Sequence, residues 1–580
     1  MRKRRRPSRR VLSWTIAGAT ALAIALALRS PGPARGMDLE AFGSLPVLNN
    51  GRIKPLDTVA RTALLQLRGK QTARVAGRSL RPVEWLLDTI ARPATADAYP
   101  VFRVDDPDVT VMAGLGGRSG REFAFRDLEP AAAEIERQGG LADAVSPRSR
   151  SRFQSGAIAL RDRVRFCRRL RHSLRPAGEG KFTAEIAGFL DAIGPGAKAI
   201  KAHQTGGKFD RRALERLGSF VQRYQALAES AEFLPLPPRP GESADDWRTV
   251  GEGMLLALRE GEPAAGVVPY ATLLEAYADG DAAIFNAELA AWRRDLRERV
   301  PGALRRAGFE VLFNRAQPFG LGMTLYLLAC LAGFASFLWR PAALRPAALA
   351  LLGSAFAVHT VGLLARILLQ GRPPVTNLYS SAVFVGWVAA GLGTLLEARQ
   401  RDALAAIVAG AIGFATLIVA HHLSLEGDSM EMMRAVLDSN FWLATHVVTV
   451  TIGYAATFLA GALGIAYLLR VAFDRSFAPG EADALAGQAY GVVCFALFFS
   501  FVGTVLGGIW ADQSWGRFWG WDPKEDGALL IVLWNAIILH ARGSRLTGVR
   551  GLMVMMVFGN VITSLSWFGV NMLGIGLHSY

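Results

Sequence analysis

The chain has 580 residues, of which 51% are hydrophobic, and a formal net charge of +16. A chain this basic could be a nucleic-acid-binding protein, but its apolar residues gather in C-terminal runs longer than soluble helices need. Membrane topology therefore explains the charge, and nucleic acid is excluded as a partner. The three cysteines, Cys167, Cys330 and Cys494, form no CxxC motif, which excludes a thiol oxidoreductase of that type and a c-type cytochrome.

The N-terminus has the pattern of a targeting segment. Seven of the first ten residues are Arg or Lys, and an apolar run follows at 11–28. This is the pattern of a signal peptide or a signal anchor. Because no clean small-x-small cleavage motif precedes Arg29, the anchor is favoured. We therefore expect residues 1–30 to direct the chain from residue 31 onward out of the cytoplasm.

Residues 31–315 form a polar, Arg-rich region whose apolar residues mostly recur at helical spacing. Turn signals surround Asn49–Gly51, and the Pro-rich stretch 234–241 (LPLPPRPG) predicts a linker or a boundary between helical lobes. His172 and His203 stand alone among basic residues, so we interpret them as surface residues. We expect a mostly helical extracytoplasmic domain that docks or scaffolds, without a catalytic constellation.

Residues 316–580 contain eight apolar runs, each close to the roughly 20 residues that a membrane-spanning helix needs. Together with residues 11–28 they predict an all-α, polytopic membrane protein of about nine spans, with its termini on opposite sides. The runs lie at 319–338, 347–369, 380–396, 403–421, 443–470, 489–510, 527–541 and 551–572.

Basic residues set the orientation, because short cytoplasmic loops are enriched in Lys and Arg. The ends of the predicted spans fall into two sets, of which one is poor in Lys and Arg. We assign that set to the outside, and it includes the segment 510–526 and the C-terminus. That outer set holds Arg372, Arg434, Arg517 and Lys524. The set assigned to the cytoplasm holds Arg2–Arg10, Arg340, Arg345, Arg399, Arg401, Arg470, Arg475, Arg542, Arg545 and Arg550.

The segment 510–526, WADQSWGRFWGWDPKED, holds four tryptophans between two apolar runs. One interpretation is an aromatic belt at the membrane interface, which usually places one or two aromatic residues at a helix end. The density favours a platform for a flat, apolar ligand, because Trp offers a large contact area and stacking geometry. The charged residues that follow are expected to order this loop. The platform residues are Trp515, Phe518, Trp519, Trp521 and Asp522.

Histidines recur at two depths of the membrane half. His446 and His578 fall at its outer end, whereas His359 and His540 fall within spans, where ionisable residues are costly and often functional. A lone buried His is usually a packing residue, but two pairs favour axial ligation of haem iron. From the helix rise, His359 and His540 lie about 15 and about 20 Å below the outer ends of their spans, close enough for one shared haem.

His421, His422 and Arg366 each allow two interpretations. His421 and His422 share the outer face, and we favour solvation at a helix end over iron ligation. Arg366 follows His359 by seven residues on the same helix face. It either contacts a haem propionate or extends its charge to the outer interface.

The stretch WGRFWGWDPKED resembles the WWD signature of membrane haem-handling proteins, most closely the CcsA type of the Ccs pathway (System II) of cytochrome c maturation. The resemblance covers roughly residues 316–580 and is not extended to 31–315. It implies that His446 and His578 flank an exposed outer haem, and that His540, in WNAIILHAR, ligates a haem inside the membrane. His359 is the candidate for its partner, although in relatives that ligand can come from a CcsB subunit.

The resemblance also extends to a loop and to the activity. The sequence GRPPVTNLYSS is similar to the family's periplasmic loop, which suggests Asn377 and Tyr379 as parts of the outer pocket. The implied activity is that of a holocytochrome c synthase (haem lyase). Haem b would move from the inner to the outer site, where the thiols of a CxxCH motif in apocytochrome c would add to it. No catalytic residue of the chain's own and no metal besides haem iron are expected.

The same resemblance implies a CcsB-like membrane partner, thiol-reducing proteins, and a location in the bacterial inner membrane with the N-terminus in the cytoplasm. Two alternatives stay open. A haem exporter or chaperone without ligase activity would fail to mature apocytochrome c, and a structural assembly subunit would show no haem absorption. A solute transporter is disfavoured, because no pair of interrupted half-helices is evident.

Overall fold

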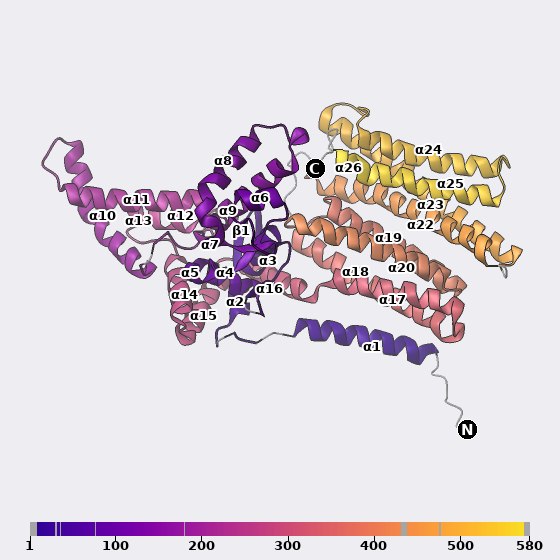
Figure 1. Cartoon of the computed structure of the whole chain (residues 1–580), viewed down its shortest axis with the longest axis horizontal. Helices are drawn as coiled ribbons and strands as arrows, with labels where there is room; N and C mark the ends of the chain where they lie inside the picture. Colours follow the sequence, from indigo (N-terminus) through magenta and orange to yellow (C-terminus); the bar gives the residue numbers. More distant parts are fainter. Residues whose placement is uncertain are drawn as a thin grey trace, which may run out of the picture. The chain divides into compact units, whose positions relative to one another are not determined.

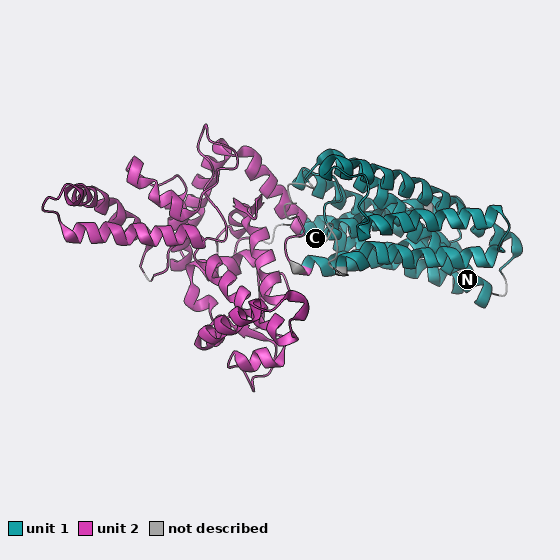
Figure 2. Cartoon of the chain, turned by 90° about the horizontal axis from the view of Figure 1, so that it is seen from above, with its two compact units in different colours: residues 1–29, 315–424, 433–580 teal, residues 30–314, 425–432 magenta. Residues whose placement is uncertain are grey.

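The computed structural model describes residues 9–29, 32–34, 36–75, 77–178, 180–430, 438–474 and 477–573. The chain divides into two compact units, which Figure 2 colours separately. Unit 1 comprises residues 1–29, 315–424 and 433–580, and unit 2 comprises residues 30–314 and 425–432. In the described ranges, strands are limited to three short two-stranded sheets, so the predicted all-α class is confirmed.

Unit 1 is a bundle of long helices that run side by side (Figure 1). Nine candidate membrane spans occur in the described part of the chain, in agreement with the number predicted. Proline opens several helices, where its fixed φ suits the first turn and its missing N–H costs nothing. The helices are α1 (Arg9–Leu28), α17 (Pro318–Leu338), α18 (Pro341–Gln370), α19 (Leu378–Gln400), α20 (Leu404–Leu423), α21 (Asn440–Trp442), α22 (Val448–Phe473), α23 (Pro479–Trp515), α24 (Pro523–Gly543), α25 (Val549–Ser564) and α26 (Val570–Leu573).

The helices of unit 1 pack in two groups. Helices α17, α18, α19 and α20 contact one another, as do α22, α23, α24 and α25, and α19 joins the groups by packing on α22. Helix α1 packs against α18. Large apolar side chains remain exposed along these helices, as expected for surfaces that face lipid. Examples are Leu338, Val361, Leu364, Leu368, Phe473, Phe498 and Phe501.

Unit 2 is mostly helical, as predicted, and has its own apolar core. Its strands are β1 (Pro46–Asn49), β2 (Arg52–Pro55), β3 (Ala73–Val75), β4 (Arg78–Leu80), β5 (Pro100–Arg103) and β6 (Glu122–Ala124). Its helices are α2 (Leu39–Gly43), α3 (Leu56–Arg68), α4 (Pro82–Ala91), α5 (Pro93–Ala96), α6 (Pro107–Met112), α7 (Phe125–Leu128), α8 (Ala132–Asp143), α9 (Arg152–Arg171), α10 (Phe182–Gln204), α11 (Arg211–Ser230), α12 (Val250–Leu255), α13 (Ala257–Glu260), α14 (Val267–Asp279), α15 (Ala282–Arg299) and α16 (Pro301–Ala316).

The turn signals at residues 49–51 mark the β1–β2 hairpin. Asn50 and Gly51 both have positive φ, at 52° and 74°, which is the requirement of a tight type I′ hairpin turn. The Pro-rich stretch at 234–241 was expected to be a linker or a boundary between helical lobes, and its pairing argues against a linker. Its Leu234 pairs with Leu48 of β1 and its Leu236 pairs with Arg248. Pairing to strand and loop residues therefore makes it part of the packed unit.

The two histidines of unit 2 that were interpreted as surface residues differ in burial. His203 is exposed, but His172 is half-buried, and burial lowers the pKa of His172 below its ordinary value. Cys167 is buried, and burial raises the pKa of its thiol to about 12, so the thiolate is not available at neutral pH.

Candidate functional site

The tryptophan-rich segment is more helical than the loop expected at 510–526. Helix α23 continues through Trp515, and α24 begins at Pro523, so residues 516–522 alone form the connection. Trp510 and Trp515 therefore stand on the last turns of a long helix. Their side chains are positioned by the helix backbone, while Trp519 and Trp521 are positioned by the short connection.

A carboxylate fixes the backbone on both sides of Trp521. Glu525 Oε2 accepts hydrogen bonds from the N–H groups of Gly520 at 2.7 Å and Asp522 at 3.2 Å. Asp522 Oδ1 accepts the N–H of Lys524 at 3.0 Å and so caps α24. The predicted ordering of the loop by its acidic residues is confirmed for Asp522 and Glu525. Trp521 has a φ of 56°, an unusual value for a bulky residue, and its side chain is 73% exposed.

The connection holds two further aromatic residues, Trp519 and Phe518. Trp519 and Trp521 meet edge to face, with ring centroids 6.3 Å apart. Phe518 is half-exposed and lies over Gly508 of α23, where a Cβ would come within 2.5 Å of its ring. The segment thus presents large aromatic faces without covering them, which is the property required of a platform.

His446 lies within a π-helical turn, Leu443–Val447, at the start of α22. Its Nδ1 lies 2.8 Å from the carbonyl oxygen of Gly503 on α23, and its ring meets Trp510 edge to face at 5.8 Å. Since a carbonyl oxygen can only accept, Nδ1–H must donate, and in the neutral ring the lone pair lies on Nε2. This arrangement orients histidines that ligate metals through Nε2. Single π-turns are frequent at functional sites.

Glycines of α23 make room for the two aromatic side chains. A Cβ at Gly507 would lie 2.6 Å from the His446 ring, and one at Gly503 would lie 2.7 Å from the backbone of Val450. Together with Gly508 under Phe518, these glycines allow close contacts along one stretch of α23, FVGTVLGGIW. They were not predicted from the sequence. The signal that could have identified them is the small-xxx-small spacing that marks close helix contacts in membranes.

Trp442 is a further residue that was not predicted from the sequence. Its ring stacks on Trp510 at 6.3 Å with an interplanar angle of 11°, and its Nε1–H donates to Gln513 Oε1 at 3.1 Å. His446 follows Trp442 by four positions, about one helical turn. The turn that carries His446 is therefore fixed to α23 at two successive points.

The remaining predicted residues of the outer site lie on other helices. Tyr379 packs under the Arg366 guanidinium, whose carbon lies 4.6 Å from the ring centroid, and Arg366 is buried. This burial argues against the interpretation that its charge extends to the interface. Asn377 caps α19 by accepting the N–H of Ser380 at 2.9 Å. His578 lies outside the described residues.

A π-helical turn, Leu565–Gly569, follows α25 towards the C-terminus. Within it Trp567 Nε1–H donates to Ser381 Oγ on α19 at 2.9 Å. Trp567 shares one apolar cluster with Tyr379 and with Val447, the neighbour of His446. The π-helical turn after α25, the first turn of α19 and the His446 turn thus pack in one cluster.

The intramembrane histidines lie in different surroundings. His359 is fully buried, with its Nδ1 3.1 Å from the Tyr326 hydroxyl and its ring against Phe319. His540 is exposed near the end of α24. In the described part of the chain no hydrogen bond or ring contact joins the two. His359 is eleven residues from the outer end of α18 and His540 is seventeen from that of α24, a depth difference of roughly 9 Å.

The rival histidines, His421 and His422, are both exposed. His422 Nδ1–H donates to the carbonyl of Ile418 in its own helix at 2.9 Å, which agrees with solvation at the end of α20. Among the described residues no cluster of three or more His, Cys, Asp or Glu side chains could hold a metal ion.

Comparison with known proteins gives a consistent assignment. The family described as Cytochrome C assembly protein matches residues 375–578, a range that includes His446, the tryptophan-rich segment and His578. Protein NrfI of Wolinella succinogenes is 26% identical over 561 residues, which is 93% of this chain and 54% of NrfI. This chain therefore spans about half of that relative.

Shorter relatives match the membrane half. The cytochrome c biogenesis protein CcsA of Parasynechococcus marenigrum is 30% identical over 244 residues, 36% of this chain and 78% of CcsA. CcsA of Pinus thunbergii is 31% identical over 271 residues, 38% of this chain and 83% of CcsA. These matches cover most of the CcsA proteins, and the chain belongs to the CcsA family of cytochrome c biogenesis proteins.

Proposed function

We propose that this protein is a cytochrome c synthase that holds haem b at the outer end of unit 1 and presents it to apocytochrome c. The main support for the proposal is the environment of the His446 side chain. Its Nδ1–H is engaged by the Gly503 carbonyl, its ring fits over Gly507, and it faces Trp510 at the tryptophan-rich segment. His578 is proposed as the second axial ligand of the iron.

The residues present suit haem as a substrate. The Nε2 lone pair of His446 is of the kind that binds haem iron. Phe518 and Trp521 offer exposed apolar rings for the macrocycle, and Trp515, Trp519 and Asp522 complete the proposed platform. Arg366 is proposed to contact a propionate, since guanidinium groups pair well with carboxylates.

The attachment itself needs little chemistry from the chain. Each cysteine thiol of the CxxCH motif adds across one haem vinyl group. A C–S bond forms, the S–H bond breaks, and the hydrogen ends on the other vinyl carbon, so no oxidant is consumed. The apocytochrome thiols must be reduced, which explains the proposed need for thiol-reducing proteins. The chain binds and orients haem, while the reactive groups belong to the haem and the apocytochrome.

Haem is proposed to reach the outer site from an inner site that involves His540, with His359 as its candidate partner. The exposed position of His540 supports access to a ligand within the membrane, whereas the burial of His359 requires α17 or α19 to yield before the imidazole can bind iron. The CcsB-like membrane partner is retained as a proposal. Unit 2 is the candidate to supply part of its role, because the NrfI match extends over 93% of this chain.

The proposed location is the bacterial inner membrane, with unit 2, the tryptophan-rich segment and the C-terminus on the outer side. Connectivity supports this orientation. Segment 425–432 belongs to the same unit as residues 30–314, and four candidate spans, α17 to α20, separate the two pieces. An even number of spans returns the chain to the side from which it entered.

Purification followed by a haem spectrum tests the proposal. We expect a Soret band in the wild-type protein and thioether attachment when reduced apocytochrome c is added. Replacing His446 with Gly should abolish attachment, and free imidazole should partly restore it by filling the vacated ligand position. The double variant His421→Ala/His422→Ala is the matched control and should retain activity.

The alternatives give distinct outcomes in the same experiment. Haem binding without attachment would identify a haem exporter or chaperone. A purified protein without a Soret band would identify a structural assembly subunit. The outer-site assignment would be overturned if the His421→Ala/His422→Ala variant lost haem attachment while the His446→Gly variant retained it.

A further inference from the structure

A cavity in unit 2 lies between helix α9 and the segment that joins β5 to α6. Its volume is about 380 Å³, which falls within the roughly 300–1,000 Å³ of small-molecule pockets. The residues that α9 contributes recur every three or four positions, so one face of this helix forms a wall. They are Arg152, Ser155, Gly156, Ala159, Leu160 and Arg163.

Helix α6 packs against α9 beside this cavity (Figure 1). Gly156 permits the contact, because a Cβ at position 156 would lie 2.9 Å from Val109 Cγ2. Val109 and Leu160 both line the cavity, and each is only 1% exposed. Part of the wall is therefore apolar and closely packed, which suits the apolar part of a ligand.

Four arginines and two aspartates line the same cavity, and both aspartates already have partners. Asp105 accepts hydrogen bonds from Arg103 Nε at 2.9 and 3.0 Å and from Arg121 Nη1 at 3.4 Å. Asp106 caps α6 by accepting the N–H of Asp108 at 2.9 Å. The two carboxylates therefore do not balance the four guanidinium groups of the lining.

Arg163 has a backbone partner in place of a carboxylate. Its Nη1–H donates to the carbonyl oxygen of Arg103 at 2.6 Å, and in the described part of the chain it forms no ion pair. Burial lowers the pKa of this guanidinium below its ordinary value; Asp105 opposes the shift and Arg103 adds to it. A half-buried cation beside a second cation is stabilised when an anion binds next to it.

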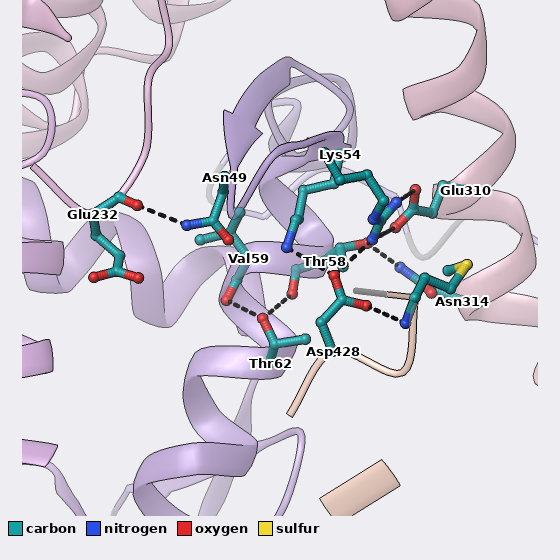
Figure 3. A network of polar contacts seen from close by, with 11 residues as sticks. Asn49, Lys54, Thr58, Val59, Thr62, Glu232, Glu310, Asn314 and Asp428 are labelled. Atoms are coloured by element: carbon teal, nitrogen blue, oxygen red, sulfur yellow. Dashed lines mark hydrogen bonds and ion pairs between the residues drawn. The ribbon is translucent and has the colours of Figure 1, made fainter. Parts of the chain in front are cut away.

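A second polar network of unit 2 shows how its buried cations are otherwise neutralised. Arg52 binds Glu310 in a bidentate manner at 2.6 and 3.0 Å. Asp428, in segment 425–432, accepts Lys54 Nζ at 2.7 Å, which Figure 3 shows, and Arg52 Nη2 at 2.9 Å. Two cations thus meet two carboxylates, which is the usual condition for burying charge. In the cavity beside α9, the opposite charge is incomplete.

Two further arginines extend the positive potential of the cavity at the start of α9. Arg150 donates its Nε–H to the Val145 carbonyl at 3.0 Å, and its Nη2 lies 3.8 Å from Asp143. Arg152 is exposed in the first helical turn, where the helix dipole disfavours a positive charge. It lies eleven positions before Arg163, about 16 Å along the helix. Arg152 therefore attracts an anion into the cavity without sharing the contact at Arg163.

We propose that this cavity binds a small organic anion, a carboxylate or a phosphate ester. The oxygens of the anion bind the Arg163 guanidinium, whose planar fork matches both chemical groups. Its short apolar part packs on Val109 and Leu160. The site lies within unit 2 and involves no haem, so it goes beyond the proposed synthase activity and does not depend on it.

Calorimetric titration of the full-length protein in detergent tests the site. Butyl phosphate and butyrate are expected to bind saturably, whereas the neutral probe butyramide is not. Arg163→Met should weaken both anions about tenfold or more, the loss expected for a charge-assisted hydrogen bond. Arg152→Gln should weaken them about threefold, since it removes a charge that makes no direct contact. The matched control is Arg211→Gln, which removes an exposed arginine of α11 that pairs with Glu215.

Hydrogen–deuterium exchange of the same samples locates the bound anion. At saturating butyl phosphate, exchange in peptides that cover 103–112 and 150–163 should fall about twofold or more, while exchange in α10 and α11 stays unchanged. The thermal unfolding transition shows whether each variant folds. If Arg163→Met does not fold, the affinity of Arg152→Gln and the exchange pattern of the wild type decide.

Three results would overturn the proposal. The first is the absence of saturable anion binding, and the second is protection of other peptides in place of 103–112 and 150–163. The third is wild-type affinity in every folded variant of Arg163 and Arg152. Dihexanoyl phosphatidylglycerol is the probe for a lipid source of the phosphate. If it binds while butyl phosphate does not, the cavity takes a lipid headgroup and the small-anion site is wrong.

Discussion

At the scale of single residues, the setting of His446 depends on what lies opposite it. Its Nδ1–H binds a backbone carbonyl of α23, and its ring occupies space left by a glycine. Neither partner contributes a functional side chain, so neither would be found by a search for chemically reactive residues. A backbone carbonyl and a missing side chain thus orient this imidazole without a charged partner.

Gly507→Val is expected to displace the His446 ring, because a Cβ at 507 would lie 2.6 Å from it. Haem retention at the outer site should fall about 10- to 100-fold, the usual cost of disturbing the orientation of a metal-ligating histidine. Haem titration of the purified protein measures this. Gly491→Val on the same helix is the control, since a Cβ there meets no atom within 4 Å. Equal haem retention in the two variants would contradict the proposed orientation.

The intramembrane histidines require a different test. His540→Ala and His359→Ala are each expected to lower copurified haem about tenfold, through loss of an axial ligand in a site with few replacements. Tyr326→Phe is the control, because it removes the hydroxyl 3.1 Å from His359 Nδ1 and leaves the imidazole in place. If His359→Ala and Tyr326→Phe have the same small effect, His359 is a packing residue and the partner of His540 lies elsewhere.

At the scale of elements, the connection between α23 and α24 is the part that departs most from a regular helical hairpin. Residues 516–522 are fixed by the capping interactions of Asp522 and Glu525 at the start of α24. Trp521 retains a left-handed backbone conformation there, which costs about 1–3 kcal/mol for a bulky residue. The hydrogen bonds on both sides of it offset that cost and keep the indole exposed.

Glu525→Ala removes the acceptor that both flanking N–H groups share, so Trp521 should relax from its left-handed conformation. We expect cytochrome c yield to fall about fivefold, which corresponds to loss of a capping interaction of about 1 kcal/mol. Trp fluorescence and maturation yield measure the effect. Asp483→Ala, an exposed acidic residue near the other end of α23, is the control and should leave both unchanged.

At the scale of the whole molecule, the two compact units do not divide the sequence at a single point near residue 315. Unit 2 takes its structure from residues 30–314 and from an eight-residue segment more than a hundred positions later. A cut between the two halves would therefore leave unit 2 without Asp428. Lys54 would lose the carboxylate that it pairs with, whereas Arg52 would keep Glu310.

The orientation of the spans predicts where reagents reach the chain. Cysteine at Ser514, in the last turn of α23, and at Ser579, which lies outside the described residues, should both react with an impermeant maleimide in intact spheroplasts. Cysteine at Arg542, assigned to the cytoplasmic side, is the control and should react only after the membrane is opened. Protection of either outer position in intact spheroplasts would reverse the assignment.

The sequence by itself determined the helical class, the number of spans and the family, because these depend on local composition. An apolar run of about 20 residues is recognisable without its neighbours, and the signature WGRFWGWDPKED is contiguous. The Asn50–Gly51 turn was visible for the same reason. The end of α23 was less accurately placed, since aromatic residues occur both in helices and in interfacial loops.

Only the tertiary structure decided which residues meet. Gly503 and Gly507 face His446 from about sixty positions away, and Asp428 meets Arg52 across 376 residues. It also separated His359 from His540 in burial and depth, although both had looked equivalent as histidines in apolar runs. Such pairings depend on how helices pack and where the chain returns, and single-residue chemistry carries no information about either.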